Sequence, residues 1–129
     1  MNALLPLILS DRAVNPKAKC FKCMRQCVME YVDLHIAGAT CTPFSKFGKR
    51  DGCDSDKYMS AFGAWAATVR ITHPKVVIFE NSDRSRDETL QTLFGDIYAI
   101  DSMKLGGPFF GWAGRRDRYY AVMVSKDSW

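Results

Sequence analysis

The sequence lacks any long hydrophobic run. Its most apolar stretch, residues 1–9, is interrupted by Pro6 and has no basic flank. A membrane-spanning helix needs about 20 apolar residues, and a secretory signal needs a charged start and a small-residue cleavage site. Internal repeats and low-complexity tracts are also absent. We therefore expect a globular chain with no membrane partner, in which residues 1–9 form a buried strand or a packed terminus.

The cysteines do not suggest a disulfide scaffold, because there are five of them, an odd number, and no secretory signal precedes them. This usage favours a reducing intracellular compartment. Cys20, Cys23 and Cys27 could bind zinc with a fourth ligand such as Cys53 or His35. There is no second Cys-x-x-Cys pair, and spacings of three and four place the three thiols on one helix face, where cysteines often pack. We therefore predict no metal site.

The charge is only slightly biased towards one sign. Lys and Arg number 18 against 14 Asp and Glu, which gives a formal net charge of +4. With 129 residues and 47% hydrophobic residues, the chain has the size and composition of one globular domain. The positive balance suits DNA or RNA as a partner, although charge alone does not select one.

Apolar periodicity and β-branched runs predict alternating helices and strands. The helices are expected at 20–32, 58–71 and 87–94, and the second should end before Pro74, which disfavours helix at His73. The strands are expected at 32–37, which should be buried, and at 76–79, 97–100 and 119–124. This order predicts an α/β sheet with crossover helices.

A long loop, residues 39–56, follows the first of these strands, and Glu80 and Asn81 follow the second. In α/β sheets the ligand lies beyond the carboxyl ends of the strands. We therefore expect the loop and the Glu80–Asn81 pair to form a site at one edge of the sheet.

Three segments carry a family resemblance. Residues 38–49 read GATCTPFSKFGK, residues 74–82 read PKVVIFENS, and residues 111–120 read GWAGRRDRYY. In this order they resemble the catalytic Cys motif, the Glu-Asn strand and the paired-Arg block of the DNA cytosine-5 methyltransferases. The resemblance implies a partial Rossmann-like sheet of the class I S-adenosylmethionine-dependent methyltransferases, with S-adenosylmethionine as methyl donor and DNA as partner.

The resemblance also implies roles for individual side chains. Cys41 would add as a thiolate to C6 of a cytosine flipped out of the DNA helix, and Glu80 would act at N3. Arg118 would hold the cytosine O2, and Arg116 would brace the site. A thiol, a carboxyl and a guanidinium are thus expected to converge on one pyrimidine ring.

The remaining site residues belong to the Cys41 loop or its neighbours. Ser45 and Lys49 match positions that contact DNA phosphates, and Lys46, Lys49 and Arg50 add positive charge that favours a thiolate. Thr40, Thr42 and Asn81 are expected around the substrate. Thr40 and Thr42 replace the Pro and Gln that flank the cysteine in the family motif, which removes rigidity that positions the thiol.

The family's glycine-rich donor turn, Phe-x-Gly-x-Gly, has no counterpart before Asp33, and no target-recognition segment follows the motifs. We therefore expect residues 1–129 to form a single, incomplete catalytic domain. It would be nuclear in a eukaryote and otherwise cytoplasmic. Two alternatives remain: an inactive nucleic-acid-binding remnant of the family, and a relative that modifies RNA, specifically tRNA.

Overall fold

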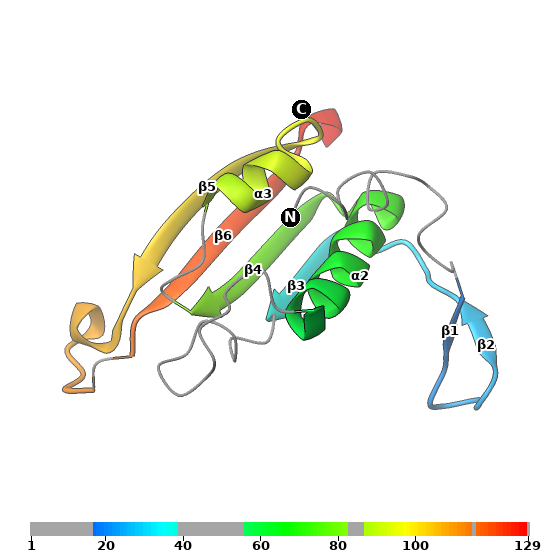
Figure 1. Cartoon of the computed structure of the whole chain (residues 1–129), viewed down its shortest axis with the longest axis horizontal. Helices are drawn as coiled ribbons and strands as arrows, with labels where there is room; N and C mark the ends of the chain where they lie inside the picture. Colours follow the sequence, from blue (N-terminus) through cyan, green and yellow to red (C-terminus); the bar gives the residue numbers. More distant parts are fainter. Residues whose placement is uncertain (1–16, 39–55, 83–86, 115, 129) are drawn as a thin grey trace.

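The computed structural model describes residues 17–38, 56–82, 87–114 and 116–128. A small hairpin comes first, formed by strands β1 (Lys17–Lys19) and β2 (Gln26–Val28). The main body then follows along the chain. Its elements are β3 (Leu34–Gly38), α2 (Asp56–Thr72), β4 (Val76–Ser82), α3 (Asp87–Phe94), β5 (Tyr98–Leu105), the 3-10 helix η3 (Gly107–Phe110), β6 (Arg118–Ser125) and the 3-10 helix η4 (Lys126–Ser128) (Figure 1).

The main body is a four-stranded sheet with the order β3-β4-β6-β5. Strand β3 pairs in parallel with β4, and helix α2 makes the crossover between them. Strand β6 runs antiparallel to both of its neighbours, β4 and β5. The carboxyl ends of β3 and β4 therefore lie at the edge of the sheet where β6 begins.

Helices α2 and α3 cover the same face of the sheet (Figure 1). Side chains alternate along a strand, so every second residue of β4 and β6 points into this helix-covered core. The core contains aromatic contacts, including the Trp65 ring stacked on Phe79 with centroids 4.7 Å apart. Its buried members are Phe62, Ala66, Ala67, Val69, Val77, Phe79, Leu90, Leu93, Phe94, Tyr98, Tyr119, Ala121 and Met123.

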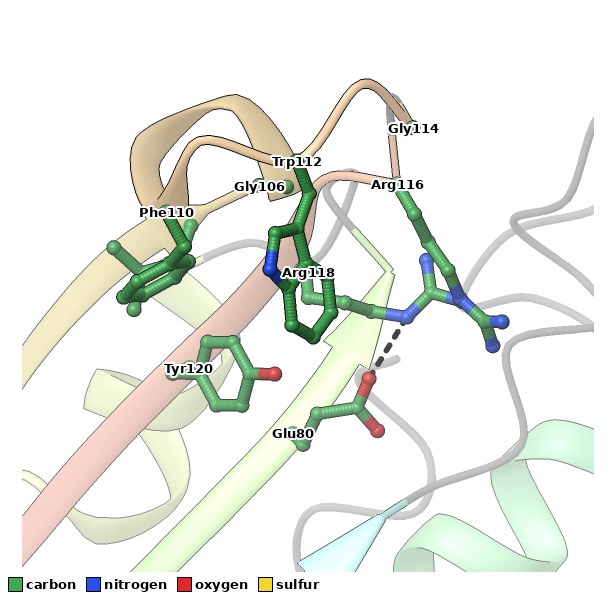
Figure 2. Close-up of a pocket in the computed structure, with 10 residues that line it drawn as sticks. Glu80, Gly106, Phe110, Trp112, Gly114, Arg116, Arg118 and Tyr120 are labelled. Atoms are coloured by element: carbon green, nitrogen blue, oxygen red, sulfur yellow. Dashed lines mark ion pairs between the residues drawn. The ribbon is translucent and has the colours of Figure 1, made fainter.

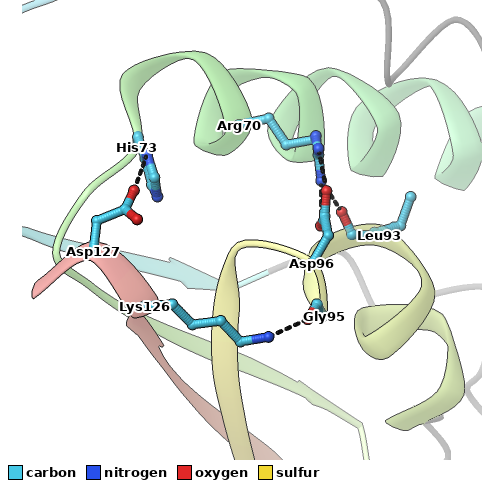
Figure 3. Close-up of polar contacts among 7 residues, drawn as sticks. All are labelled: Arg70, His73, Leu93, Gly95, Asp96, Lys126 and Asp127. Carbon is cyan, nitrogen blue, oxygen red and sulfur yellow. Dashed lines mark hydrogen bonds and ion pairs between the residues drawn. The ribbon is translucent and has the colours of Figure 1, made fainter. Parts of the chain in front are cut away.

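Polar contacts at one end of the body join α2 to the later elements (Figure 3). Arg70 donates to the Leu93 carbonyl at 2.6 Å and to both Asp96 oxygens at 2.8 and 2.6 Å. Lys126 Nζ donates to the Gly95 carbonyl at 2.7 Å. These contacts hold the end of α3 and the start of β5 against α2 and the C-terminal turn.

Most predicted elements are confirmed, and three of the four predicted strands, now β4, β5 and β6, are longer than expected. The predicted helix 87–94 coincides with α3, and the predicted helix 58–71 lies within α2. Helix α2 ends at Thr72, and His73 adopts a left-handed φ of 43° before Pro74. Strand β4 continues through Glu80 and Asn81, so these two residues lie inside the strand rather than after it. The predicted α/β sheet with a crossover helix is confirmed.

The predicted helix 20–32 is wrong, because this segment forms the turn and the second strand of the β1–β2 hairpin and an irregular stretch after it. The Cys20 amide donates to the Arg25 carbonyl, and Met24 has a left-handed φ of 56° in the turn between the strands. The apolar side chains that suggested a helix contact no core: Phe21 is 89% exposed and Met24 63%. A helical spacing of apolar residues predicts a helix only when a core covers that face.

The expectation of burial for the strand at 32–37 is also wrong. Strand β3 lies at the sheet edge with no outer neighbour among the described residues, and its Ile36 side chain is 69% exposed. The predictions for residues 1–9 and for the loop from 39 to 55 lie outside the described residues. In the part of the chain that is described, no helix has the length and apolar character needed to span a membrane.

Candidate functional site

Glu80 and Arg118 form an ion pair at the edge of the sheet. Arg118 Nε lies 2.9 Å from Glu80 Oε1, and the two side chains are 23% and 37% exposed respectively. The strand register brings them together, because Glu80 pairs with Tyr120, and Arg118 stands two residues earlier on β6, opposite Ser82. Both side chains point away from the helix-covered core, since their strand neighbours Phe79 and Tyr119 are buried in it.

A pocket surrounds this ion pair (Figure 2). It has a volume of about 520 Å³, within the range of about 300–1,000 Å³ that is usual for small-molecule sites. The β5–β6 connection forms one wall, and strands β4 and β6 form the floor. The lining residues are Glu80, Leu105, Gly106, Gly107, Phe110, Trp112, Gly114, Arg116, Arg118 and Tyr120.

Backbone hydrogen bonds shape the β5–β6 connection. The Trp112 amide donates to the Gly107 carbonyl at 3.0 Å, and Gly111 turns the chain with a left-handed φ of 77°. A Cβ atom on Gly106 would clash with the Asp117 carboxylate, and one on Gly107 would clash with the Gly114 carbonyl. Glycine is therefore required where the two ends of this connection approach each other.

Three aromatic side chains at the pocket were not predicted as site residues: Phe110, Trp112 and Tyr120. Phe110 and Trp112 are 67% and 74% exposed, although large apolar side chains usually favour burial. Trp112 and Tyr120 lie within the segment that resembles the paired-Arg block, so that resemblance could have identified them as site residues. Flat aromatic surfaces beside a carboxylate and two guanidinium groups suit a planar, polar ligand such as a nucleobase.

Of the predicted site residues, Glu80, Arg116 and Arg118 line this one pocket. Asn81 does not, because its side chain is buried on the helix-covered face, where Oδ1 accepts a hydrogen bond of 2.7 Å from the Ser82 amide. Asn81 therefore lies on the opposite face of the sheet from Glu80 and Arg118. The predicted residues of the Cys41 loop lie outside the described residues: Thr40, Cys41, Thr42, Ser45, Lys46, Lys49 and Arg50.

Gly38 nevertheless links the loop to the pocket. It is the last residue of β3, and it pairs directly with Glu80. A Cβ atom on Gly38 would lie 3.4 Å from Glu80 Oε2. The Cys41 loop therefore departs from the sheet beside the second oxygen of the same carboxylate that binds Arg118.

His35 serves the fold rather than the pocket. Its Nε2 accepts a hydrogen bond of 3.1 Å from Trp65 Nε1, and burial lowers the pKa of the imidazole. An acceptor nitrogen and a lowered pKa both correspond to the neutral ring. This arrangement ties β3 to α2 next to the stacked Trp65 and Phe79 rings.

The described residues contain no Phe-x-Gly-x-Gly turn of the kind that is expected to bind S-adenosylmethionine. Among the described glycines, Gly95, Gly106 and Gly107 have Cβ positions crowded by this chain's own atoms, whereas Gly111 and Gly114 face open space. The described residues therefore offer no donor site built on that motif.

The fold resembles two solved methyltransferase structures. One is described as a DNA modification methyltransferase encoded within a prophage (E. coli), with a TM-score of 0.54 and 20% identity over 77% of this chain and 28% of the other. The second is the S. pombe Dnmt2 methyltransferase, with a TM-score of 0.53 and 21% identity over 72% of this chain and 30% of the other. These likenesses confirm the expected fold, part of a Rossmann-like class I methyltransferase sheet.

The chain spans less than a third of either of those structures. No curated protein gives a significant match. A model of C-5 cytosine-specific DNA methylase matches residues 25–129, which is most of the sequence. The chain therefore belongs to the C-5 cytosine-specific DNA methylase family.

Proposed function

We propose that this chain is the base-activating part of a catalytic domain that transfers a methyl group to C5 of cytosine in DNA. One observation carries the proposal: the Glu80–Arg118 ion pair lies in a pocket at the edge where the Cys41 loop leaves β3. Cys41 is three residues beyond Gly38, so its Cα lies within about 11 Å of the Gly38 Cα. We propose that the Cys41 thiolate, the Glu80 carboxyl and the Arg118 guanidinium act on one bound base.

The chemistry assigns one task to each group. Cytosine C5 is a poor nucleophile, and addition of the Cys41 thiolate to C6 converts the ring to an enamine that is nucleophilic at C5. Glu80 supplies the proton or hydrogen bond that N3 needs as negative charge moves onto it. After C5 has gained the methyl group it loses its proton, and the Cys41–C6 bond breaks to restore the thiolate.

Arg118 is proposed to bind O2, the exocyclic oxygen on the ring carbon next to N3. The O2 atom of cytosine is adjacent to N3, so a base with N3 at Glu80 presents O2 to the guanidinium beside that carboxylate. Arg118 uses Nε to bind Glu80 and one terminal nitrogen to donate to the Asp117 carbonyl at 3.1 Å. These two contacts orient the side chain before a base arrives, which reduces the entropy that binding costs.

We propose that the pocket wall contacts the base and that the loop residues contact the nucleic-acid backbone. Trp112 and Phe110 provide exposed rings against which an extruded base can stack. Arg116 lies at the pocket mouth and is exposed, so it supports the site or contacts a phosphate. Ser45, Lys46, Lys49 and Arg50 are proposed to contact DNA phosphates, and Thr40 and Thr42 to support the loop around the substrate. Asn81 is proposed to support β4 from its buried face. S-adenosylmethionine is the donor that the family implies, and it would bind outside the described residues.

Exchange of the C5 hydrogen tests the proposal without a methyl donor. Adding the thiol at C6 allows solvent to protonate C5, so DNA tritiated at cytosine C5 should release tritium to water. Cys41→Ala should abolish release, and Glu80→Gln should slow it by roughly 100-fold. Glu88→Gln is the matched control, because it removes an exposed carboxylate from α3, away from the pocket, and should leave the rate unchanged.

Covalent trapping provides the second measurement. The chain joined to a donor-binding segment should form an adduct with a DNA duplex that contains 5-fluorocytosine, and Cys41→Ala should form none. Neither release nor adduct in a protein that binds the same duplex would refute the catalytic role.

A second candidate is an inactive nucleic-acid-binding remnant of the family. That candidate predicts salt-sensitive DNA binding that Cys41→Ala and Glu80→Gln leave unchanged. Competition between tRNA and duplex DNA for binding tests the third alternative, a relative that modifies tRNA: that alternative predicts that tRNA displaces the duplex.

A further inference from the structure

The β1–β2 hairpin gathers three thiols at its turn. The sulfur atoms of Cys20, Cys23 and Cys27 all lie within 4.8 Å of one another, and those of Cys23 and Cys27 are 3.3 Å apart. Tetrahedral zinc with Zn–S bonds of about 2.3 Å holds its sulfur ligands about 3.8 Å apart. Each sulfur–sulfur distance therefore needs to change by about 1 Å or less to reach the geometry of a metal site.

Backbone N–H groups of Cys23 and Lys22 hydrogen-bond to the Cys20 sulfur. Three thiolates and one dication carry a net charge of −1, which basic side chains on the same hairpin can balance. Those side chains are Lys17, Lys19, Lys22 and Arg25.

The hairpin is short and lies outside the main sheet. Its two strands contain three residues each and, among the described strands, pair with each other. The aromatic and thioether side chains at its turn, Phe21 and Met24, are exposed rather than packed. Two-stranded hairpins without a covered face are marginally stable in water, so an additional cross-link is needed for a fixed structure. In Figure 1 the hairpin projects from the main sheet.

We propose that Cys20, Cys23 and Cys27 bind a soft divalent cation of the zinc class, with solvent as the fourth ligand, and that this metal orders the β1–β2 hairpin. Thiolates select such cations over magnesium or calcium. His35 is not the fourth ligand, because its Nε2 accepts from Trp65 within the main body. The site does not depend on the proposed methyl-transfer function: the family match begins at Arg25, after two of the three cysteines.

Metal titration of the purified chain tests the proposal. The chain is kept in a non-thiol reductant, stripped with a chelator and titrated with Zn²⁺ against a chromophoric competitor. We expect one Zn²⁺ per chain, and Co²⁺ should give the absorption bands of tetrahedral thiolate coordination. Cys20→Ser, Cys23→Ser and Cys27→Ser should each weaken binding by roughly 100-fold. Cys41→Ser is the matched control, because it removes a thiol from outside the hairpin and should leave affinity unchanged.

Limited proteolysis measures the ordering. Trypsin cleaves after Lys22 and Arg25, which lie between the cysteines. At a Zn²⁺ concentration 100 times Kd, cleavage there should slow by about 100-fold, since only metal-free chains open. Circular dichroism should show unchanged helix content in the serine variants, because the core contains no hairpin residue. No bound Zn²⁺, binding that persists in all three serine variants, or a Cys23–Cys27 disulfide that forms despite added Zn²⁺ would overturn the proposal.

Discussion

Substituting Arg70 should destabilise the main body through three hydrogen bonds that join α2 to the turn between α3 and β5. Its guanidinium donates to both oxygens of Asp96 and to the Leu93 carbonyl, at distances of 2.6 to 2.8 Å (Figure 3). The Arg70 side chain is 19% exposed, whereas Asp96 is 55% exposed. The ion pair is thus half in solvent, and the carbonyl contact lies on its more buried side.

The two contacts contribute differently to the free energy of unfolding. A partly exposed pair such as Arg70–Asp96 contributes about 1 kcal/mol. Leaving the half-buried Leu93 carbonyl without its donor costs about 1–2 kcal/mol more. Arg70→Met, which keeps most of the apolar stem, should therefore lower the free energy of unfolding by about 2–3 kcal/mol. Arg70→Lys keeps the charge but lacks the planar fork, and should lose about half as much.

Urea unfolding followed by tryptophan fluorescence measures these values, because Trp65 lies against the core. A double-mutant cycle with Asp96→Asn should give a coupling energy of about 1 kcal/mol, since the substituted groups are in direct contact. Arg25→Met is the matched control, because it removes an arginine from the hairpin and should change stability by less than about 0.5 kcal/mol.

The pH dependence follows from the same hydrogen bonds. The hydrogen bond from Arg70 holds the pKa of Asp96 below its ordinary value. A carboxyl with a lowered folded pKa stabilises the fold above its unfolded pKa of about 4, and this stabilisation disappears as the pH falls through the folded pKa. The stability difference between wild type and Arg70→Met should therefore shrink below about pH 4. A difference under about 0.5 kcal/mol at pH 7, or one that does not vary between pH 2 and pH 6, would refute the reasoning.

Substitutions at three further positions test the core and the site. Tyr119→Phe removes the main hydrogen bond that lowers the pKa of Asp87; it should cost about 1 kcal/mol at pH 7 and progressively less below about pH 4 in urea titrations. Gly38→Val places methyl groups beside Glu80 Oε2, so tritium release should fall while the urea midpoint changes little, and an unchanged release rate would contradict the assigned position of the carboxylate. Phe79→Ala empties a core position that is 2% exposed and should cost about 3–5 kcal/mol, against less than about 1.5 for Phe79→Leu, in the same titrations.

The sequence predicted those elements whose signals are local. A β-branched run marks the first four residues of β4, and the following Gly95 marks the end of α3, so α3 was placed correctly and β4 was placed except for its last three residues. The hairpin was missed because Phe21, Met24 and Val28 recur at helical spacing, and spacing does not reveal whether a core covers that face. Long-range packing decides that question, and it leaves all three side chains exposed.

The candidate site was also predicted only in part from the sequence. Glu80 and Arg118 were named from sequence motifs, because the chemistry of the family requires those residue types. The pocket wall of Phe110 and Trp112 was not predicted, because it depends on how the β5–β6 connection turns back over the strands. Motif residues are therefore predictable one by one, whereas the volume they enclose depends on the three-dimensional path of the chain.

Strand alternation explains how a half-exposed carboxylate keeps a defined position at a sheet edge. Phe79 and Asn81 are buried in the helix-covered core on either side of Glu80, so the backbone that carries the carboxylate is fixed from below. A shift of β4 by one residue would move Glu80 into that core and expose Phe79, which burial of the aromatic ring opposes. The same register sets Gly38 and Tyr120 opposite Glu80. The placement of the carboxylate beside Arg118 is thus enforced by apolar side chains on the opposite face of the sheet, rather than by the ion pair itself.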